Sequence, residues 1–262
     1  MPDASRWDRF GGAVLGLEVP VGLLAAWEGA AHLGWISAKL LPAPSTVLVA
    51  VADLAASGDL WMHVWATLWR VLVGFGLGVA AGTAMGALTG YSTLARRLLD
   101  PMLQALRNIP SIAWVPLFIL WFGIFETSKV LLIAVGVFFP VYLNLASAIH
   151  EVDRKLVEVA RAYRFSPLEL VWRVLLPASL PTYVIGLRSG LGLGWMFVVA
   201  AEFMGASEGL GYLLIDGQMT GRTPVILGAI VLFAVLGKLT DLALARATAP
   251  LVAWQDGFKS KR

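Results

Sequence analysis

The sequence contains no cysteine and few charged side chains. Of its 262 residues, 14% are charged and 58% are hydrophobic. The absence of cysteine excludes disulfides, thiolate nucleophiles and cysteine-ligated metals. A soluble domain usually carries about a quarter of charged residues, so the shortage indicates that lipid covers most of the surface. The net charge of +3 is too small to indicate nucleic-acid binding.

Motifs for catalysis and for nucleotide binding are also missing. His32, His63 and His150 share no metal-ligand spacing, so we expect no metal site. No GxxxxGK[ST] phosphate loop occurs, because Gly237-Lys238-Leu239 lacks the hydroxyl and the upstream glycine. No Ser/His/Asp arrangement has a plausible pocket context. We therefore expect that this chain is not an enzyme and holds no cofactor.

Long hydrophobic runs are abundant. A helix needs about 20 apolar residues to cross a hydrocarbon core of about 30 Å. Six stretches qualify, at residues 13–33, 68–90, 101–123, 128–149, 183–203 and 223–245. The first carries Glu18 and Glu28, but its apolar part is longer than that of a signal peptide. The sequence therefore predicts an all-α membrane protein, with residues 1–262 forming a single transmembrane domain.

The distribution of positive charge predicts the orientation. With six spans both termini lie on one side, and an excess of Lys and Arg marks the cytoplasmic side. With the termini inside, the outer segments hold only Lys39, Arg70, Lys129 and Arg222. The inner segments hold Arg6, Arg9, Arg96, Arg97, Arg154, Lys155, Arg161, Arg164, Arg173, Arg246, Lys259, Lys261 and Arg262. We therefore predict cytoplasmic N- and C-termini.

Small residues and tryptophans form helical patterns near the second span. Ser45 is expected to N-cap a short helix that ends near Ala56. Trp61, Trp65 and Trp69 recur every four residues, as in an aromatic belt at a membrane boundary. Glycines also recur every four residues, a spacing that lets helices pack closely in lipid. They are Gly74, Gly78, Gly82, Gly86 and Gly90 in the second span and Gly186, Gly190 and Gly194 in the fifth.

A charged segment, residues 151–181, separates the fourth and fifth spans. Its first half has a helical pattern, with an apolar face of Leu156, Val159, Ala160 and Tyr163. Ser166-Pro167-Leu168-Glu169 then has the form of a capping box, which begins a second helix. Pro177 and Pro181 are expected to end that helix. The segment is therefore predicted to be a cytoplasmic helical hairpin.

The hairpin resembles the cytoplasmic loop of permease subunits of bacterial ATP-binding cassette importers. The matching residues are Glu158 and Ala160, followed by Val174-x-Leu176-Pro177. The family has a glycine where this chain has Arg164. A left-handed arginine costs on the order of 1 kcal/mol. Either the turn relaxes, or Arg164 gains a contact with the ATPase.

The whole chain resembles the nitrate/sulfonate/taurine group of these permeases. The resemblance lies in LLPAPSTVL, LRNIPSIAWVPLFILWFGI, LLPASLP, GLRSGLGLGWMFVVAAEF and GLGYLL, and it is nearest to aliphatic sulfonate permeases. It implies a type I ABC importer permease fold in the bacterial inner membrane. It also implies a homodimer, two ATPase subunits that hold ATP and Mg, and a periplasmic or lipid-anchored solute-binding protein.

Two groups of site residues follow from the resemblance and the topology. The first, expected to couple to the ATPase, consists of Glu158, Ala160, Arg161, Tyr163, Arg164, Ser166 and Pro167. The second, expected along the translocation pathway, consists of Arg107, Asn108, Ser111, Trp114, Arg188, Trp195 and Glu202. Arg107 and Arg188 either extend to the inner interface or bind an anion through forked hydrogen bonds.

Alternative functions remain open on sequence grounds. Within the same group the solute could be an aliphatic sulfonate, taurine, nitrate or a small aromatic acid. An ion-coupled secondary transporter would need ionisable groups near the midplane and two similar halves, but the halves share only glycine stripes. A membrane-embedded enzyme would need clustered carboxylates or histidines on facing helices, which the sequence does not indicate.

Overall fold

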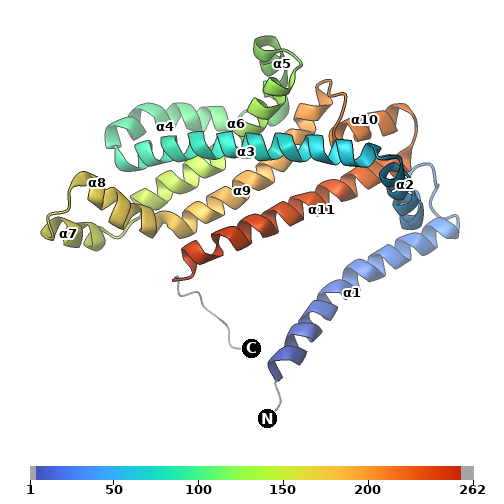
Figure 1. Ribbon diagram of the computed structural model, residues 1–262, viewed down its shortest axis with the longest axis horizontal. Coiled ribbons are helices and arrows are strands. Elements are labelled where there is room, and N and C mark those ends of the chain that lie inside the picture. Colours follow the sequence, from blue (N-terminus) through green and yellow to red (C-terminus); the bar gives the residue numbers. More distant parts are fainter. Residues whose placement is uncertain (1–3, 255–262) are drawn as a thin grey trace. The chain divides into compact units, whose positions relative to one another are not determined.

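The computed structural model describes the backbone of residues 4–254, and it describes the side chains of residues 18–254 except 111, 167 and 168. Within this range the chain is helical and contains no strand (Figure 1). The α-helices are α1 (Ala4–His32), α2 (Pro44–Ser57), α3 (Asp59–Tyr91), α4 (Thr93–Arg107), α5 (Ser111–Phe122), α6 (Glu126–His150), α7 (Arg154–Ala162), α8 (Pro167–Leu170), α9 (Leu176–Phe203), α10 (Leu210–Met219) and α11 (Thr223–Thr248).

Four helical segments in the described part of the chain are long and apolar enough to cross a membrane. They are Asp59–Tyr91, Glu126–His150, Val171–Phe203 and Thr223–Val252. The predicted spans at 68–90, 128–149, 183–203 and 223–245 lie within them. The first predicted span, 13–33, overlaps α1, but the side chains of residues 4–17 lie outside the described residues, so that span stays a prediction.

The third predicted span, 101–123, is not one continuous helix. The helices α4 and α5 meet at a bend of 107°. Pro110 lies directly before α5 and has extended backbone angles, with φ of −57° and ψ of 143°, so the helical path is interrupted there. The side-chain amide of Asn108 donates to the carbonyl oxygen of Gln104 at 3.1 Å and so closes the end of α4.

The prediction that Pro177 and Pro181 end the second hairpin helix is wrong. The helix continues from α8 through a π-helical turn, Val171–Leu175, directly into α9. Pro177 directly follows the π-helical turn, which accommodates its missing N–H, and Pro181 lies inside α9. The second helix of the hairpin therefore continues into the membrane span without a loop, and Val171–Phe203 is one helical segment.

Contacts divide the chain into two compact units. In the first, residues 1–62 with 213–231, the side chain of Glu28 accepts hydrogen bonds from the backbone and hydroxyl of Ser45, at 3.0 and 2.6 Å. The prediction that Ser45 is the N-cap of α2 is therefore wrong. The helix begins at Pro44, after Ala43, and a carboxylate of α1 takes the capping role.

In the second unit, residues 63–212 with 232–262, α6 is packed between α3 and α9 through the glycine stripes. A Cβ added to Gly78 of α3 would lie 2.6 Å from Val137 of α6, and one added to Gly186 of α9 would lie 2.7 Å from Asn144. Only a hydrogen fits at these positions. The predicted close packing of both stripes is confirmed, and it buries Ile133, Val137 and Val141 in the core.

Candidate functional sites

The predicted hairpin begins with α7. Asp153 caps α7, and its carboxylate accepts a hydrogen bond from the N–H of Lys155 at 2.9 Å. After α7 the chain turns at Arg164, whose φ of 56° makes it the one non-glycine residue with positive φ in the described chain. The N–H of Phe165 reaches back to the carbonyl of Ala160 at 3.1 Å, which closes the helix end in the Schellman manner.

Arg164 therefore keeps the left-handed conformation that glycine would adopt, so the turn does not relax. Its side chain is exposed and makes no ion pair within the described part of the chain. A non-glycine residue held in this region stores strain of about 1 kcal/mol or more, and such outliers often mark functional turns. No ion pair or hydrogen bond of this side chain offsets the strain among the residues that the structure describes.

The capping box at the start of the second helix is confirmed. The hydroxyl of Ser166 accepts from the N–H of Glu169 at 3.3 Å, and the Glu169 carboxylate accepts from the N–H and hydroxyl of Ser166, both at 3.0 Å. These hydrogen bonds favour the charged carboxylate and lower the pKa of Glu169 below its ordinary value. The side chain of Pro167, another predicted coupling residue, lies outside the described residues.

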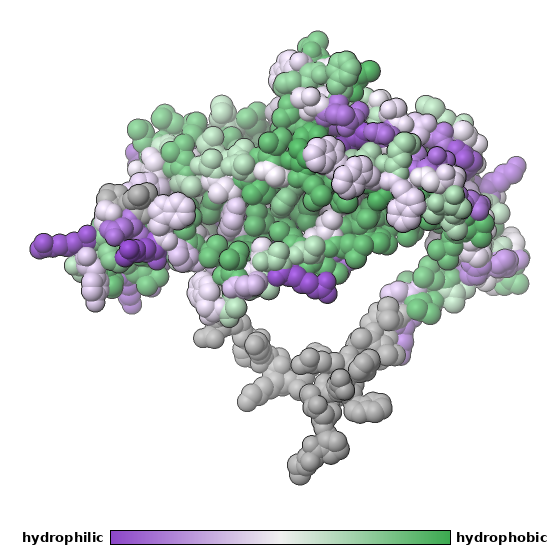
Figure 2. Space-filling view, in the orientation of Figure 1, coloured by the Kyte–Doolittle hydropathy of each residue, from purple (hydrophilic) through white to green (hydrophobic). Residues whose placement is uncertain are grey.

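Between the two helices of the hairpin lies an open apolar groove, which we call the hairpin groove. It has a volume of about 680 Å³. Leu156, Val159, Ala160 and Tyr163 line it from α7, and Val174 and Pro177 line it from the following segment. Tyr163 is 75% exposed. Charged side chains gather around this end of the second unit, whereas the helices beyond it are mainly hydrophobic (Figure 2, left).

The charges beside the groove are arranged in exposed pairs on the two helices. Arg154 contacts Glu158 at 3.0 Å on α7, and Arg173 contacts Glu169 at 3.7 Å. The guanidinium of Arg173 also lies over the ring of Phe165, 5.7 Å from its centroid. Arg161 is exposed on α7 and lies near the ends of α3 and α6. Exposed pairs of this kind contribute little stability, so they remain available to a partner.

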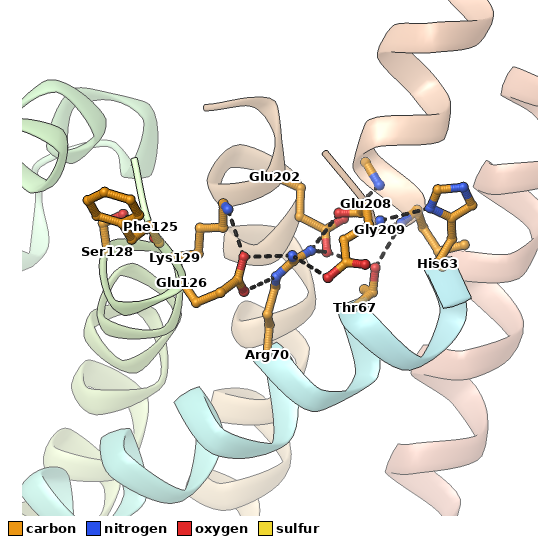
Figure 3. A network of polar contacts seen from close by, with 12 residues as sticks. His63, Thr67, Arg70, Phe125, Glu126, Ser128, Lys129, Glu202, Glu208 and Gly209 are labelled. Carbon is orange, nitrogen blue, oxygen red and sulfur yellow. Dashed lines mark hydrogen bonds and ion pairs between the residues drawn. The ribbon is translucent and has the colours of Figure 1, made fainter. Parts of the chain in front are cut away.

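A second polar site lies at the opposite end of the same unit, and we call it the Arg70 cluster. Arg70 of α3 is 1% exposed and Glu202 of α9 is fully buried. The guanidinium donates to Glu202 at 2.9 Å and, in a forked pair at 2.6 and 2.8 Å, to Glu126 at the start of α6. Figure 3 shows Arg70 at the centre, with carboxylates on both sides.

Hydrogen bonds extend the cluster in both directions. Thr67 donates to Glu202 at 2.7 Å and accepts from the N–H of Leu210 at 2.8 Å. Glu202 also accepts from the N–H of Gly211 at 2.7 Å, and Lys129 donates to Glu126 at 2.8 Å. The cluster therefore joins α3, α6, α9 and the start of α10. Every charged member has a partner of opposite sign, as burial in an apolar environment requires.

Sequence reasoning found only one residue of this cluster, Glu202, and proposed it for the translocation pathway. It missed the role of Arg70, because Arg70 was counted only as a loop charge near a membrane boundary. The signal was present: Thr67 and Arg70 lie on the tryptophan-bearing helix, and a charge within an apolar span needs a partner. The sequence does not show that Glu202 is the partner of Arg70. The two residues are 132 positions apart and meet only because α3 and α9 pack together.

The structure distributes the predicted pathway residues over three places. Arg107, Asn108 and Trp114 line one cavity of about 400 Å³ at the α4–α5 bend, which we call the bend cavity. Arg188 of α9 is paired in a forked manner with Asp241 of α11, at 2.8 Å for both contacts. Trp195 donates to the hydroxyl of Thr240 at 2.9 Å. Glu202 belongs to the Arg70 cluster, and the side chain of Ser111 lies outside the described residues.

No group of three or more His, Asp or Glu side chains in the described chain could hold a metal ion. The polar sites instead consist of an exposed hairpin, a buried ion-pair cluster and a cavity lined by one guanidinium. Such an arrangement suits docking and passage of a solute.

Comparison with known families identifies this architecture. Residues 74–248 match the family of binding-protein-dependent transport system inner membrane components, and the chain belongs to this family. It is thus a multi-pass membrane subunit of an ABC importer and not itself the ATPase, as the sequence predicted.

Individual relatives support the same assignment. The chain is 42% identical over 248 residues to the aliphatic sulfonates transport permease protein SsuC of Bacillus subtilis, covering 95% of this chain and 90% of the relative. It is 34% identical to the taurine transport system permease protein TauC of Escherichia coli, covering 95% and 92%. Among solved structures, the inward-facing MetNI methionine ABC transporter matches with a TM-score of 0.65 at 23% identity, over 74% of this chain and 98% of that one. This last similarity confirms the predicted type I importer permease fold.

Proposed function

We propose that this chain, as a homodimer, forms the translocation pathway of an ATP-driven importer for aliphatic sulfonates. The observation that carries the proposal is the hairpin groove. The groove is an exposed apolar surface surrounded by charged side chains at the end of a membrane-spanning helix, and this exposure does not stabilise the isolated chain. It suits the insertion of the hairpin into a soluble ATPase, with side chains of the partner filling the groove.

In this proposal each coupling residue has a role. Ala160 and Tyr163 supply apolar contact, whereas Glu158, Arg161 and Arg164 supply charged contacts at the edge. Ser166 and Glu169 fix the start of the second helix. Because this helix continues into α9, a force applied to the hairpin moves the membrane span with it.

The remaining partners follow from the same proposal. ATP and Mg bind to two partner ATPase subunits at the cytoplasmic face, and a periplasmic or lipid-anchored binding protein delivers the solute. The hairpin and both termini lie in the cytoplasm of the cell, as the positive charge distribution favours. ATP-driven closure of the ATPases then moves the permease between two states as rigid bodies.

The solute assignment is supported by the similarity to SsuC over nearly the whole chain. Taurine is the second candidate, because TauC is also similar along the same length. Both solutes carry a sulfonate group, and taurine differs by an ammonium group. We favour the aliphatic sulfonate because identity to SsuC is higher.

Reconstitution tests the proposal directly. The permease, its ATPase and its binding protein are placed in proteoliposomes with ATP inside, and uptake of labelled butanesulfonate, taurine and nitrate is measured. We expect sulfonate uptake that vanadate abolishes and an uncoupler leaves intact. Uptake that needs an ion gradient and no ATP would instead establish a secondary transporter. Preferential uptake of taurine would select the second candidate.

A further inference from the structure

The bend cavity has features that the proposed function leaves unassigned. It lies where α4 ends and α5 begins, and residues of α6 and α9 complete its wall. Phe139 of α6 belongs to that wall. At a rise of about 1.5 Å per residue it lies roughly 16 to 20 Å from either end of α6. The cavity therefore lies near the middle of the membrane-spanning helices.

Arg107 is the charged residue of this cavity. It is exposed, and no ion pair or hydrogen bond to its guanidinium occurs within the described part of the chain. By contrast, Arg70 of α3 and Arg188 of α9 are both paired with carboxylates. A guanidinium at this depth is too far from either interface to extend to the headgroups, and hydrocarbon would be a costly neighbour. It therefore faces water, an anion or the second subunit of the proposed homodimer.

The rest of the cavity is mainly apolar. Trp114, Phe139, Leu193 and Phe197 form its wall, and Asn108 adds an amide whose N–H₂ is already bonded to Gln104. Among the described lining residues none is acidic. A cavity of about 400 Å³ with one fixed positive end and an apolar body matches an amphiphile with one anionic group and a short chain.

We propose that the bend cavity is a binding site for the alkanesulfonate during its passage, and this rests on the proposed function. Arg107 binds two sulfonate oxygens through its forked N–H groups, and Trp114, Phe139 and Phe197 contact the alkyl chain. The same site discriminates against taurine, because the ammonium group would be desolvated without an acidic partner. Nitrate would fill only the charged end.

Uptake by the complete importer tests the site at a saturating concentration of binding protein. Arg107→Gln removes the charge, and we expect the maximal uptake rate of butanesulfonate to fall by about ten- to hundred-fold, as expected for the loss of a charged hydrogen bond. Arg107→Lys keeps the charge and is expected to retain most of the rate. Arg97→Gln, an exposed arginine on the same helix, is the matched control and should leave uptake unchanged.

Chain-length selectivity supplies a readout that damage to the fold would not move. Phe139→Ala is expected to slow uptake of octanesulfonate more than that of ethanesulfonate, whereas Arg107→Gln slows both equally. ATPase activity stimulated by the loaded binding protein is measured in each variant as a test of assembly. We expect this activity to persist in Arg107→Gln.

Three results would overturn the site. They are equal uptake by Arg107→Gln and Arg97→Gln, a parallel loss of uptake and stimulated ATPase in both Arg107 variants, or unchanged chain-length selectivity in Phe139→Ala. Failure of the proposed function gives a different result. A wild-type complex that imports no sulfonate would overturn that function together with the sulfonate as occupant of the cavity.

Discussion

In the hairpin, charged side chains stand exposed around an apolar groove, whereas in the Arg70 cluster they are buried and paired with one another. Both regions depart from the apolar character of the chain. In the cluster, the partners of each charge come from this chain, so removing one damages the fold. In the hairpin groove, the apolar lining residues Leu156, Val159 and Tyr163 stay about half or more exposed in the described part of the chain, so changes should affect a complex and spare the fold. This contrast separates structural charge from functional charge.

The largest expected effect comes from the Arg70 cluster. Arg70→Met leaves Glu202 fully buried without its positive partner, and we expect a loss of about 3–5 kcal/mol in the free energy of unfolding, as for other broken buried ion pairs. Unfolding of the purified protein in detergent measures it.

A double variant distinguishes pairing from packing. Arg70→Met combined with Glu202→Gln removes both buried charges, so it should be less damaging than the sum of the single variants. Arg222→Met, an exposed arginine paired with Asp216, is the control and should change stability by less than about 1 kcal/mol. Additive losses in the double variant would show that the two charges do not stabilise each other.

The hairpin groove should respond in the opposite way. Leu156→Asp introduces a charge on the α7 side of the groove, where Leu156 is 49% exposed. We expect little change in unfolding, but a loss of about 2 kcal/mol in ATPase binding, or roughly 30-fold in Kd, as for a buried interface residue. Co-purification and titration with the ATPase measure it.

Lys155→Ala, on α7 but outside the groove lining, is the matched control. It should bind nearly as the wild type does. If Leu156→Asp lowers stability and leaves ATPase binding intact, the groove belongs to the fold, and the contrast with the Arg70 cluster disappears.

The two regions also differ in how far the sequence predicts them. The hairpin is local: Ser166 and Glu169 are three residues apart, and the apolar face of α7 follows a helical repeat. Its capping box could therefore be predicted, whereas whether the turn at Arg164 stays left-handed was left open. The continuation through Pro177 could not, because the π-helical turn that accommodates it has no sequence signal of its own.

The Arg70 cluster is non-local, since it needs the packing of α3 on α6 and of α6 on α9. The glycine stripes predicted that helices approach closely, but not which faces meet. The same limit explains why the role predicted for Ser45 is wrong: its backbone N–H donates to the carboxylate of Glu28, which lies 17 residues away. The cavity wall that α6 and α9 add around Arg107 is also non-local, so it required the structure.

Arg164 tests whether strain in the hairpin serves the complex. Arg164→Gly removes the strain of a left-handed arginine, so we expect the unfolding free energy to rise by up to about 1 kcal/mol. If the exposed guanidinium contacts the ATPase, the same variant should lower the affinity of the complex and the coupled ATPase activity. Arg164→Asn, which tolerates this conformation, separates backbone from side chain. Unchanged affinity in both variants would assign the arginine no role in docking.

The smallest expected effect concerns the pH dependence of the capping box. The hydrogen bonds from Ser166 lower the pKa of Glu169 in the folded chain, so their stabilisation is complete above the pKa of the unfolded state. It is lost as the pH falls below about 4 and through the lowered pKa. NMR titration of the Glu169 carboxyl, assigned with Glu169→Gln, should show an acid-shifted midpoint in the wild type and a normal one in Ser166→Ala. Ser92→Ala, which removes the N-cap of α4, should leave that midpoint unchanged.

Because this carboxylate is exposed, loss of its charge should loosen the hairpin without unfolding the membrane helices, whereas disruption of the Arg70 cluster should unfold them. A titration of Glu169 that unfolds the whole chain would remove this distinction.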